Sequence, residues 1–214
     1  IQGISGLLDA HLSGERTDQL QMVRTIIYDK VTALTAAQSI TAALLARERG
    51  AGGQHVKLSM LDAALYFNWP DLMWNFSFKG QGVQYSPDLA DMCEVNETKD
   101  GAIISSYLGA DCSGYETEQL LQLLAENDIP VGRVNRRSQV ITDPQVRASG
   151  TLLDIQHPRG GELVQPRAAA QFSQTPTPAP QASAELGEHT VEVLSELGLS
   201  LEEMQALAHQ GAIG

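Results

Sequence analysis

Cysteine is scarce in this sequence. Cys93 and Cys112 are the only two among 214 residues, too few and too irregularly placed for a disulfide framework or a cysteine-based zinc site. Two free thiols in a reducing cytoplasm are therefore expected. The five histidines are scattered, without the HxxH or HxxE spacing of metal ligands, so no metal site is predicted.

Basic residues and long apolar runs are also scarce. Lys and Arg total 14 against 26 Asp and Glu, which gives a formal net charge of −12. Nucleic-acid binding needs clustered cations to neutralise phosphates, so this balance argues against it, although a local basic pocket for a phosphate-bearing cofactor stays compatible with it. No apolar run reaches the roughly 20 residues that cross a bilayer, so no membrane-spanning helix is expected. A hydrophobic content of 43% is typical of a globular protein.

The first third of the chain predicts an extended segment followed by a long helix. Residues 22–28 form a short apolar run typical of a buried strand. Residues 31–49 lack Gly and Pro and are apolar on nearly every face, the pattern of a buried helix. Residues 55–60 alternate polar and apolar side chains, as a half-buried strand does. A second helical stretch is expected over 61–79, interrupted at Pro70.

Short elements alternate through the rest of the chain. They are strands at 94–98 and 102–107, a helix at 117–127, a strand at 129–134, a helical turn from Asp143, strands at 152–156 and 162–164, and helices at 188–197 and 201–210. Asp100-Gly101 is a hairpin signal between the first two strands, and Ser200 with Glu203 forms a capping box. Residues 175–181, dense in Pro, Thr and Ala, have no folding pattern. Periodicity alone therefore supports a mixed α/β chain.

Asp29 holds the most suggestive position in the sequence. It ends the apolar run and precedes the long helix, whose first backbone N–H groups and dipole favour a negative charge. A carboxylate in that place stays ionised and can act as a nucleophile or a proton acceptor. Asp is also among the commonest N-cap residues, so local chemistry by itself favours a structural role. Residue type and position leave both roles open.

Several segments together form a longer pattern. They are Gln2–Gly6, Asp29–Ala33, Ala42–Arg47, Gly50–Ala63, Asp143–Val146 with Gly150, Phe172–Pro176, and Leu186–Thr190 with Leu194 and Leu197-Gly198. The fourth of these contains a Gly-x-Gly-Gln turn and ends on Met-x-Asp-Ala. In order and spacing, these segments resemble the signature of the class III coenzyme A transferases, the CaiB/BaiF family. The resemblance covers almost the whole chain.

In that family the residue that matches Asp29 is the catalytic carboxylate. The resemblance implies that Asp29 attacks an acyl-CoA thioester and forms a mixed anhydride and then an aspartyl-CoA thioester, from which a small carboxylic acid takes the CoA. Coenzyme A, carried as the acyl-CoA substrate, is the cofactor implied, without a metal. Met60 is a candidate lining residue of the acyl pocket, although a Met in an alternating pattern is commonly a core residue.

Two other functions fit the same residues. A sister branch of the family racemises 2-methylacyl-CoA thioesters with the matching Asp as general base, paired with an upstream His that would lie before Ile1. A non-catalytic remnant or interaction subunit would keep the packing without the chemistry. The sequence settles neither the branch nor the acyl group and its acceptor.

The resemblance also implies an architecture. It predicts an α/β fold with a partial Rossmann-like large domain and a small α+β domain, within an interlocked cytoplasmic homodimer. Residues 1–80 would belong to the large domain and its linking helix, 81–150 to the small domain, and 151–214 to a linker and helices that return to the large domain. Family members are considerably longer, so the chain is expected to be the C-terminal part of such a protein. Between Tyr107 and Tyr115 it also skips a stretch usual in the small domain.

Overall fold

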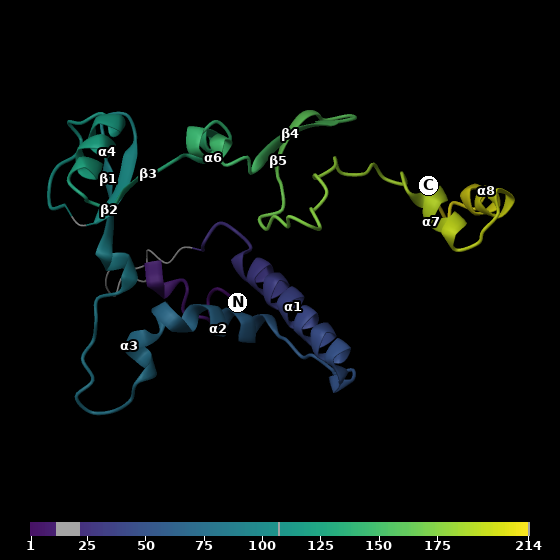
Figure 1. Ribbon diagram of the computed structural model, residues 1–214, viewed down its shortest axis with the longest axis horizontal. Coiled ribbons are helices and arrows are strands. Elements are labelled where there is room, and N and C mark those ends of the chain that lie inside the picture. Colours follow the sequence, from purple (N-terminus) through teal and green to yellow (C-terminus); the bar gives the residue numbers. More distant parts are fainter. Residues whose placement is uncertain (12–21, 107, 214) are drawn as a thin grey trace. The chain divides into compact units, whose positions relative to one another are not determined.

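A computed structural model describes residues 1–11, 22–106 and 108–213 (Figure 1). The chain divides into two compact units, residues 1–134 and residues 135–214. The first unit holds the long helices and a three-stranded sheet, and the second holds a two-stranded sheet and the closing helices. Both units mix helices and strands, which confirms the predicted α/β class.

Two helices dominate the start of the first unit. A short 3-10 turn, η1 (Asp9–His11), comes first, and α1 (Ile27–Ala46) then packs against α2 (Met60–Leu72). The π-helical turn η3 (Arg47–Ala51) ends α1, and Gly50 in it adopts a φ of 91°, which glycine tolerates at little cost. Pro70 lies inside α2, and a separate short helix, α3 (Trp74–Ser77), follows it. The second helical stretch is interrupted, but at Met73, three residues after the predicted position at Pro70.

Two of the predicted strands do not form. Residues 22–26 have no regular structure and α1 begins at Ile27, so Asp29 lies inside the first helical turn rather than before it. Residues 55–59 are exposed and have no regular structure, and Met60 already starts α2. An alternating pattern becomes a strand only beside a hydrogen-bonding partner strand, and these residues pair with none of the described strands.

Helix α1 is less buried than its composition predicts. Tyr28 is its only fully buried residue, whereas Leu34 and Ile40 are 73% and 54% exposed. A helix that is apolar on every face is expected to have packing partners all round. Within the described chain α1 packs chiefly against α2, so the prediction of a buried helix is wrong for this chain taken alone.

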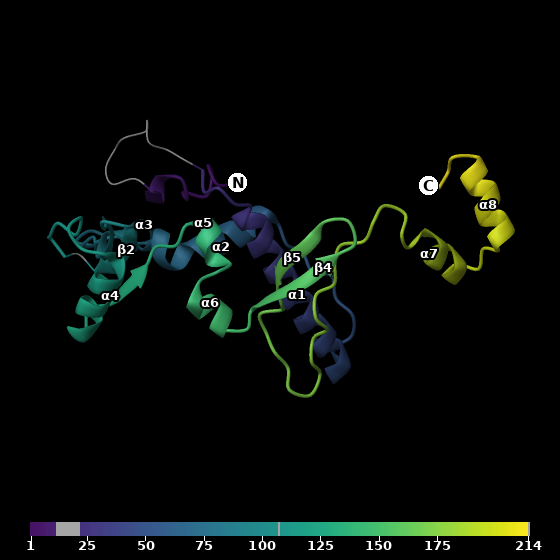
Figure 2. The same ribbon diagram turned by 90° about the horizontal axis from the view of Figure 1, so that it is seen from above.

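A three-stranded antiparallel sheet forms the other part of the first unit. The turn η4 (Leu89–Met92) leads into β1 (Cys93–Glu97), which is followed by β2 (Ala102–Ser106) and β3 (Val131–Arg133) in the order β1-β2-β3. Helix α4 (Thr117–Glu126) packs on β2 and β3 (Figures 1 and 2). The predicted hairpin, the amphipathic helix and the third strand are therefore confirmed with small shifts at their ends, except at Tyr107, which lies outside the described residues.

The hydrophobic core of this region lies between the sheet and α4. Ile103 is completely buried, and it clusters with Cys112, Leu120 and Leu124. Leu120 and Leu124 are one helical turn apart and so share one face of α4. Partly buried side chains complete the cluster, namely Leu108, Leu121, Ile129 and Val131. Burial raises the pKa of the Cys112 thiol, and both cysteines are free, as predicted.

The second unit consists of short elements. In order they are α5 (Arg137–Val140), α6 (Pro144–Ala148), the antiparallel hairpin of β4 (Leu152–His157) and β5 (Gly161–Pro166), and the helices α7 (Thr190–Glu196) and α8 (Leu201–His209). Asp143 caps α6 by accepting the Val146 N–H at 2.9 Å. Ser200 and Glu203 form the predicted capping box of α8, and residues 175–181 have no regular structure.

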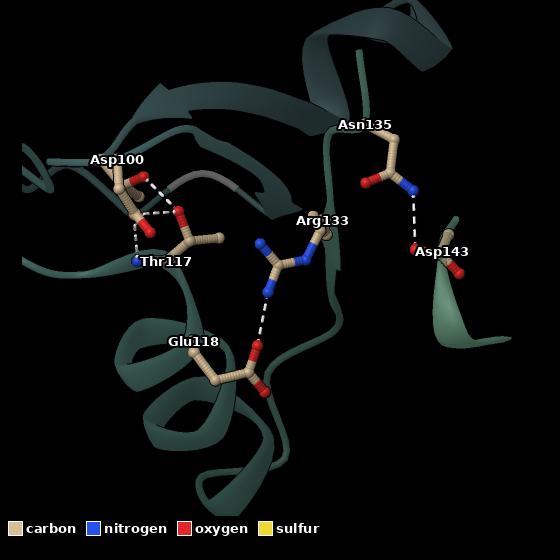
Figure 3. A network of polar contacts seen from close by, with 7 residues as sticks. Asp100, Thr117, Glu118, Arg133, Asn135 and Asp143 are labelled. Atoms are coloured by element: carbon tan, nitrogen blue, oxygen red, sulfur yellow. Dashed lines mark hydrogen bonds and ion pairs between the residues drawn. The ribbon is translucent and has the colours of Figure 1, made fainter. Parts of the chain in front are cut away.

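A polar network ties the β1–β2 turn to the start of α4 (Figure 3). Asp100 accepts the Thr117 hydroxyl at 2.5 Å and the Thr117 backbone N–H at 2.7 Å. The hydroxyls of Thr98 and Thr117 lie 2.6 Å apart, and Arg133 forms an ion pair with Glu118 beside them. The hydrogen bonds from the Thr117 hydroxyl and backbone hold the pKa of Asp100 below its usual range.

We expect Asp100→Asn to weaken this region at neutral pH and to reduce its sensitivity to acid. A carboxyl whose pKa is lowered by folding contributes stability above its ordinary pKa of 3.8, and this stability is lost as the pH falls through the lower folded value. Asn lacks the charge and does not titrate. Thermal unfolding followed by circular dichroism from neutral pH to about pH 3 should therefore show a smaller acid-induced fall of the midpoint in the variant.

The control for this experiment is Asp91→Asn, which removes one carboxylate but leaves the acceptor of Thr117 in place. Asp91 lies in η4 and is exposed. This variant should keep the acid sensitivity of the wild type. An equal acid-induced fall in Asp100→Asn and wild type would contradict the role given to Asp100.

Candidate functional site

Asp29 is the third residue of α1 and is exposed. The N-cap position belongs to Ile26, so the capping role that local chemistry favoured for Asp29 is not realised. The backbone N–H groups of a first helical turn lack acceptors within the helix, and the helix dipole favours negative charge there. Within the described chain, no group forms a hydrogen bond or an ion pair with the Asp29 carboxylate. The Asp29 carboxylate is therefore accessible.

Neither of the two other site residues considered from the sequence, Lys30 and Met60, contacts the Asp29 carboxylate. Lys30 is exposed, and its Nζ donates to the Thr25 hydroxyl at 2.8 Å rather than to Asp29. Met60 is half-buried at the start of α2. The part of α2 that meets the first turn of α1 is at Asn68, which is about 12 Å further along the helix axis at 1.5 Å per residue.

Tyr28, the residue before Asp29, belongs to a buried polar cluster with Ser5 and Asn68. The Tyr28 hydroxyl is 2.8 Å from the Ser5 hydroxyl and accepts a hydrogen bond from Asn68 Nδ2 at 2.7 Å. Asn68 Nδ2 also donates to the Ser5 backbone carbonyl at 3.0 Å. All three residues are at most 3% exposed. The cluster joins the N-terminal segment, α1 and α2 at one point.

Gln2 anchors the segment that enters α1. Its Nε2 donates to the backbone carbonyls of Val23 at 3.1 Å and Thr25 at 3.2 Å, and its Oε1 accepts the Val23 N–H at 2.9 Å. Gln2 and Ser5 were noted from sequence only as part of a pattern, and Asn68 was not singled out. Their polarity gave no signal of burial, because a polar residue is by default expected at the surface.

One open groove lies at the opposite end of α1 from Asp29. It has a volume of about 320 Å³, and it is lined by Ile40, Ala43, Leu44, Arg47, Gly53, Gln54 and Val56. The described residues include no cluster of three or more side chains suited to hold a metal ion. They also include no helix that is both long and apolar enough to cross a membrane.

Known proteins match this chain over most of its length. The profile of CoA-transferase family III matches residues 1–111 and 85–190. Succinate–glutarate CoA-transferase from Agrobacterium fabrum is 26% identical over 243 residues, covering 92% of this chain and 59% of the relative. Formyl-CoA:oxalate CoA-transferase from Rhodopseudomonas palustris is 33% identical over 96 residues, covering 44% of this chain and 22% of the relative.

The fold is shared with a solved structure. A CaiB/BaiF family protein from Brucella suis superposes with a TM-score of 0.71 at 20% identity, covering 92% of this chain and 61% of that one. The chain thus spans about three fifths of the length of this protein and of the Agrobacterium relative. Because the two profile matches overlap and together run from residue 1 to residue 190, the chain belongs to CoA-transferase family III, the CaiB/BaiF family.

Proposed function

We propose that the intact protein, with whatever sequence flanks this chain, transfers coenzyme A between an acyl-CoA and a small carboxylic acid, with Asp29 as its nucleophile. The observation that carries this proposal is the accessible carboxylate of Asp29 in the first turn of α1, inside the matched part of the family profile. The relatives named above, both CoA-transferases, support transfer rather than another reaction of an acyl-CoA.

The chemistry divides a difficult exchange into easier steps. An oxygen of Asp29 attacks the thioester carbonyl, the carbon–sulfur bond breaks, and CoA leaves as the thiolate. The thiolate then attacks the Asp29 carbonyl of the mixed anhydride, which releases the first acyl group as its carboxylate and leaves an aspartyl-CoA thioester. The acceptor carboxylate repeats the first step on this thioester. Attack of the thiolate on the acceptor carbonyl releases the new acyl-CoA and restores Asp29 with no net proton transfer.

The place of Asp29 suits these steps. A carboxylate serves here as nucleophile and as leaving group, and both roles require the anionic form. The carboxylate lies at the positive end of the α1 dipole each time it is restored. Because no described residue forms a hydrogen bond or an ion pair with the carboxylate, its oxygens are free to attack the thioester.

Trapping with hydroxylamine tests this proposal. Hydroxylamine attacks anhydrides and thioesters, so incubation of the intact protein with an acyl-CoA should convert Asp29 to a hydroxamate that mass spectrometry detects. Succinyl-CoA and formyl-CoA are suitable first probes, since succinate and formyl-CoA appear in the names of the relatives. With a 2-methylacyl-CoA as probe, solvent deuterium entering the carbon next to the carbonyl, without any hydroxamate, would instead identify a racemase that uses Asp29 as a base. If neither the hydroxamate nor the deuterated acyl-CoA forms, the result favours a non-catalytic protein.

We also propose that the intact protein is a cytoplasmic homodimer in which a second copy covers much of α1. Support comes from the exposed apolar side chains of this helix, among them Leu34, Ile40 and Leu45, and from its open groove. Residues 1–80 and 151–214 would serve a large domain, and 81–150 a small one. Light scattering of the intact protein measures the oligomeric state, and a monomer at micromolar concentration would contradict this part.

A further inference from the structure

We propose that Ser5, Tyr28 and Asn68 act with Gln2 as positioning residues that fix the Asp29 carboxylate through the backbone of the first turn of α1. This inference rests on the proposed role of Asp29 as nucleophile. It assigns to the N-terminal segment a task in the reaction, although none of the four side chains is placed to touch the substrate.

The hydrogen bonds of the cluster have one consistent direction. Asn68 Nδ2 uses its two hydrogens on the Ser5 carbonyl and on the Tyr28 hydroxyl oxygen. The Ser5 and Tyr28 hydroxyls share a further hydrogen bond, in which Tyr28 is the donor when the Ser5 hydrogen is used elsewhere. The Ser5 hydroxyl in turn donates to the Gln2 carbonyl at 3.3 Å. The opposite orientation of the Asn68 amide would bring its oxygen against the Ser5 carbonyl, so Asn68 is the donor in both of its bonds.

Gln2 fixes the chain on the other side of the same turn. Its amide satisfies both backbone groups of Val23 as well as the carbonyl of Thr25. The residues that lead into the helix are therefore held by a side chain from 21 to 23 positions earlier in the sequence. Gln2 binds the backbone before the helix start at Ile27, and the buried cluster binds the Tyr28 side chain after it, so both sides of the helix start are held.

Asp29 follows Tyr28 directly, and its own side chain makes no hydrogen bond to any described residue. Neighbouring helical residues point in different directions, so Tyr28 reaches inward while the Asp29 carboxylate stays at the surface. The Thr32 hydroxyl further binds the Tyr28 backbone carbonyl at 2.6 Å. The position of the carboxylate is thus set by the backbone, and the backbone is set by the buried cluster.

A contribution to folding stability does not by itself explain why these buried side chains are polar. Asn68 Oδ1 is buried without a partner among the described residues, and an unsatisfied buried acceptor lowers stability. Apolar side chains of similar size would fill the same space without that cost. Buried polar networks do, however, specify one arrangement of the groups they join. A nucleophile that must meet a thioester carbonyl in one orientation benefits from such a fixed arrangement.

The test is Tyr28→Phe in the intact protein, which removes one oxygen and keeps the ring. We expect kcat for CoA transfer to fall about 10- to 100-fold, with KM for the acyl-CoA changed by less than about two-fold, because a misplaced nucleophile slows the chemical step and leaves substrate binding intact. Hydrogen–deuterium exchange of the amides at 30–32, the first in α1 to have acceptors within the helix, should become faster. Tyr66→Phe is the matched control, since it removes the same atom from an exposed position of α2 (83% exposed), and it should change neither quantity.

A second variant protects the test against a loss of folding. Ser5→Ala removes one partner of Tyr28 and leaves the tyrosine in place, so it should reproduce the fall in kcat to a smaller extent. Unchanged kcat in both variants, or a lower unfolding temperature without a change in kcat, overturns the proposal. Unfolding of both variants also overturns it, since the cluster would then serve the fold alone. Full activity of Asp29→Asn would show a different failure, that of the proposed function itself.

Discussion

Asp29→Ala is expected to lower the rate of CoA transfer by the intact protein by about four orders of magnitude or more, the loss typical for removal of a covalent nucleophile. The variant lacks the atom that carries the acyl group and then the CoA, so no intermediate forms. Steady-state rates with the acyl-CoA and acceptor that support trapping, together with hydroxylamine trapping itself, measure the effect. Both signals should disappear together.

Asp29→Asn separates the nucleophile from the shape of the side chain. The amide has nearly the same size as the carboxylate but does not attack a thioester, so its activity should match that of Asp29→Ala. Glu202→Gln is the control, because it makes the same chemical change at an exposed carboxylate in the first turn of another helix, α8. This control should keep full activity. Wild-type rates in Asp29→Ala would rule out both the transferase and the racemase roles of this residue.

The loss of activity should not come from a loss of folding. Asp29 is exposed and has no bonding partner among the described residues, and substitutions at such positions have small effects on stability. The unfolding temperature of Asp29→Ala is therefore expected to stay close to that of the wild type. A large fall in this temperature would instead identify a structural role that the described contacts do not show.

Local patterns predicted those elements whose partners are close in the sequence. The β1–β2 hairpin turns at Asp100-Gly101, and α4 follows with Leu120 and Leu124 on one face, so both were evident from residue spacing. The strand predicted before α1 was wrong because the partner of this segment is distant in the sequence. Its apolar run resembles a strand, but the backbone groups of Val23 pair with the side chain of Gln2. A side chain 21 residues away in the sequence thus takes the bonds that a neighbouring strand would need.

The residues that surround Asp29 also could not be predicted from local sequence patterns. Position before a long helix and the family resemblance singled out the carboxylate itself. The cluster behind it depends on a contact between Ser5 and Asn68, which are 63 residues apart, and on the burial of polar side chains. Periodicity carries neither kind of information, because it reports which residues share a face and not which distant residues meet.

Ile103→Ala is expected to destabilise the β1–β3 sheet and α4 by about 2–5 kcal/mol, the usual range for truncating a large buried aliphatic side chain. Ile103 is 0% exposed and is the largest fully buried side chain among the described residues. It lies on the central strand, opposite Asn96 on one side and Arg133 on the other. Strands on both sides and α4 above limit any collapse into the cavity, so the loss should lie well inside this range.

Hydrogen–deuterium exchange of the amides in β2 and α4 measures this effect inside the intact protein. A loss of 2–5 kcal/mol in the free energy of opening corresponds to exchange faster by roughly 30-fold to several thousand-fold. Ile104→Ala is the matched control, because Ile104 is the next residue of the same strand, points to the opposite face and is 43% exposed. It should raise exchange by less than about ten-fold. Equal acceleration in the two variants would mean that the buried cluster around Ile103 does not hold this region together.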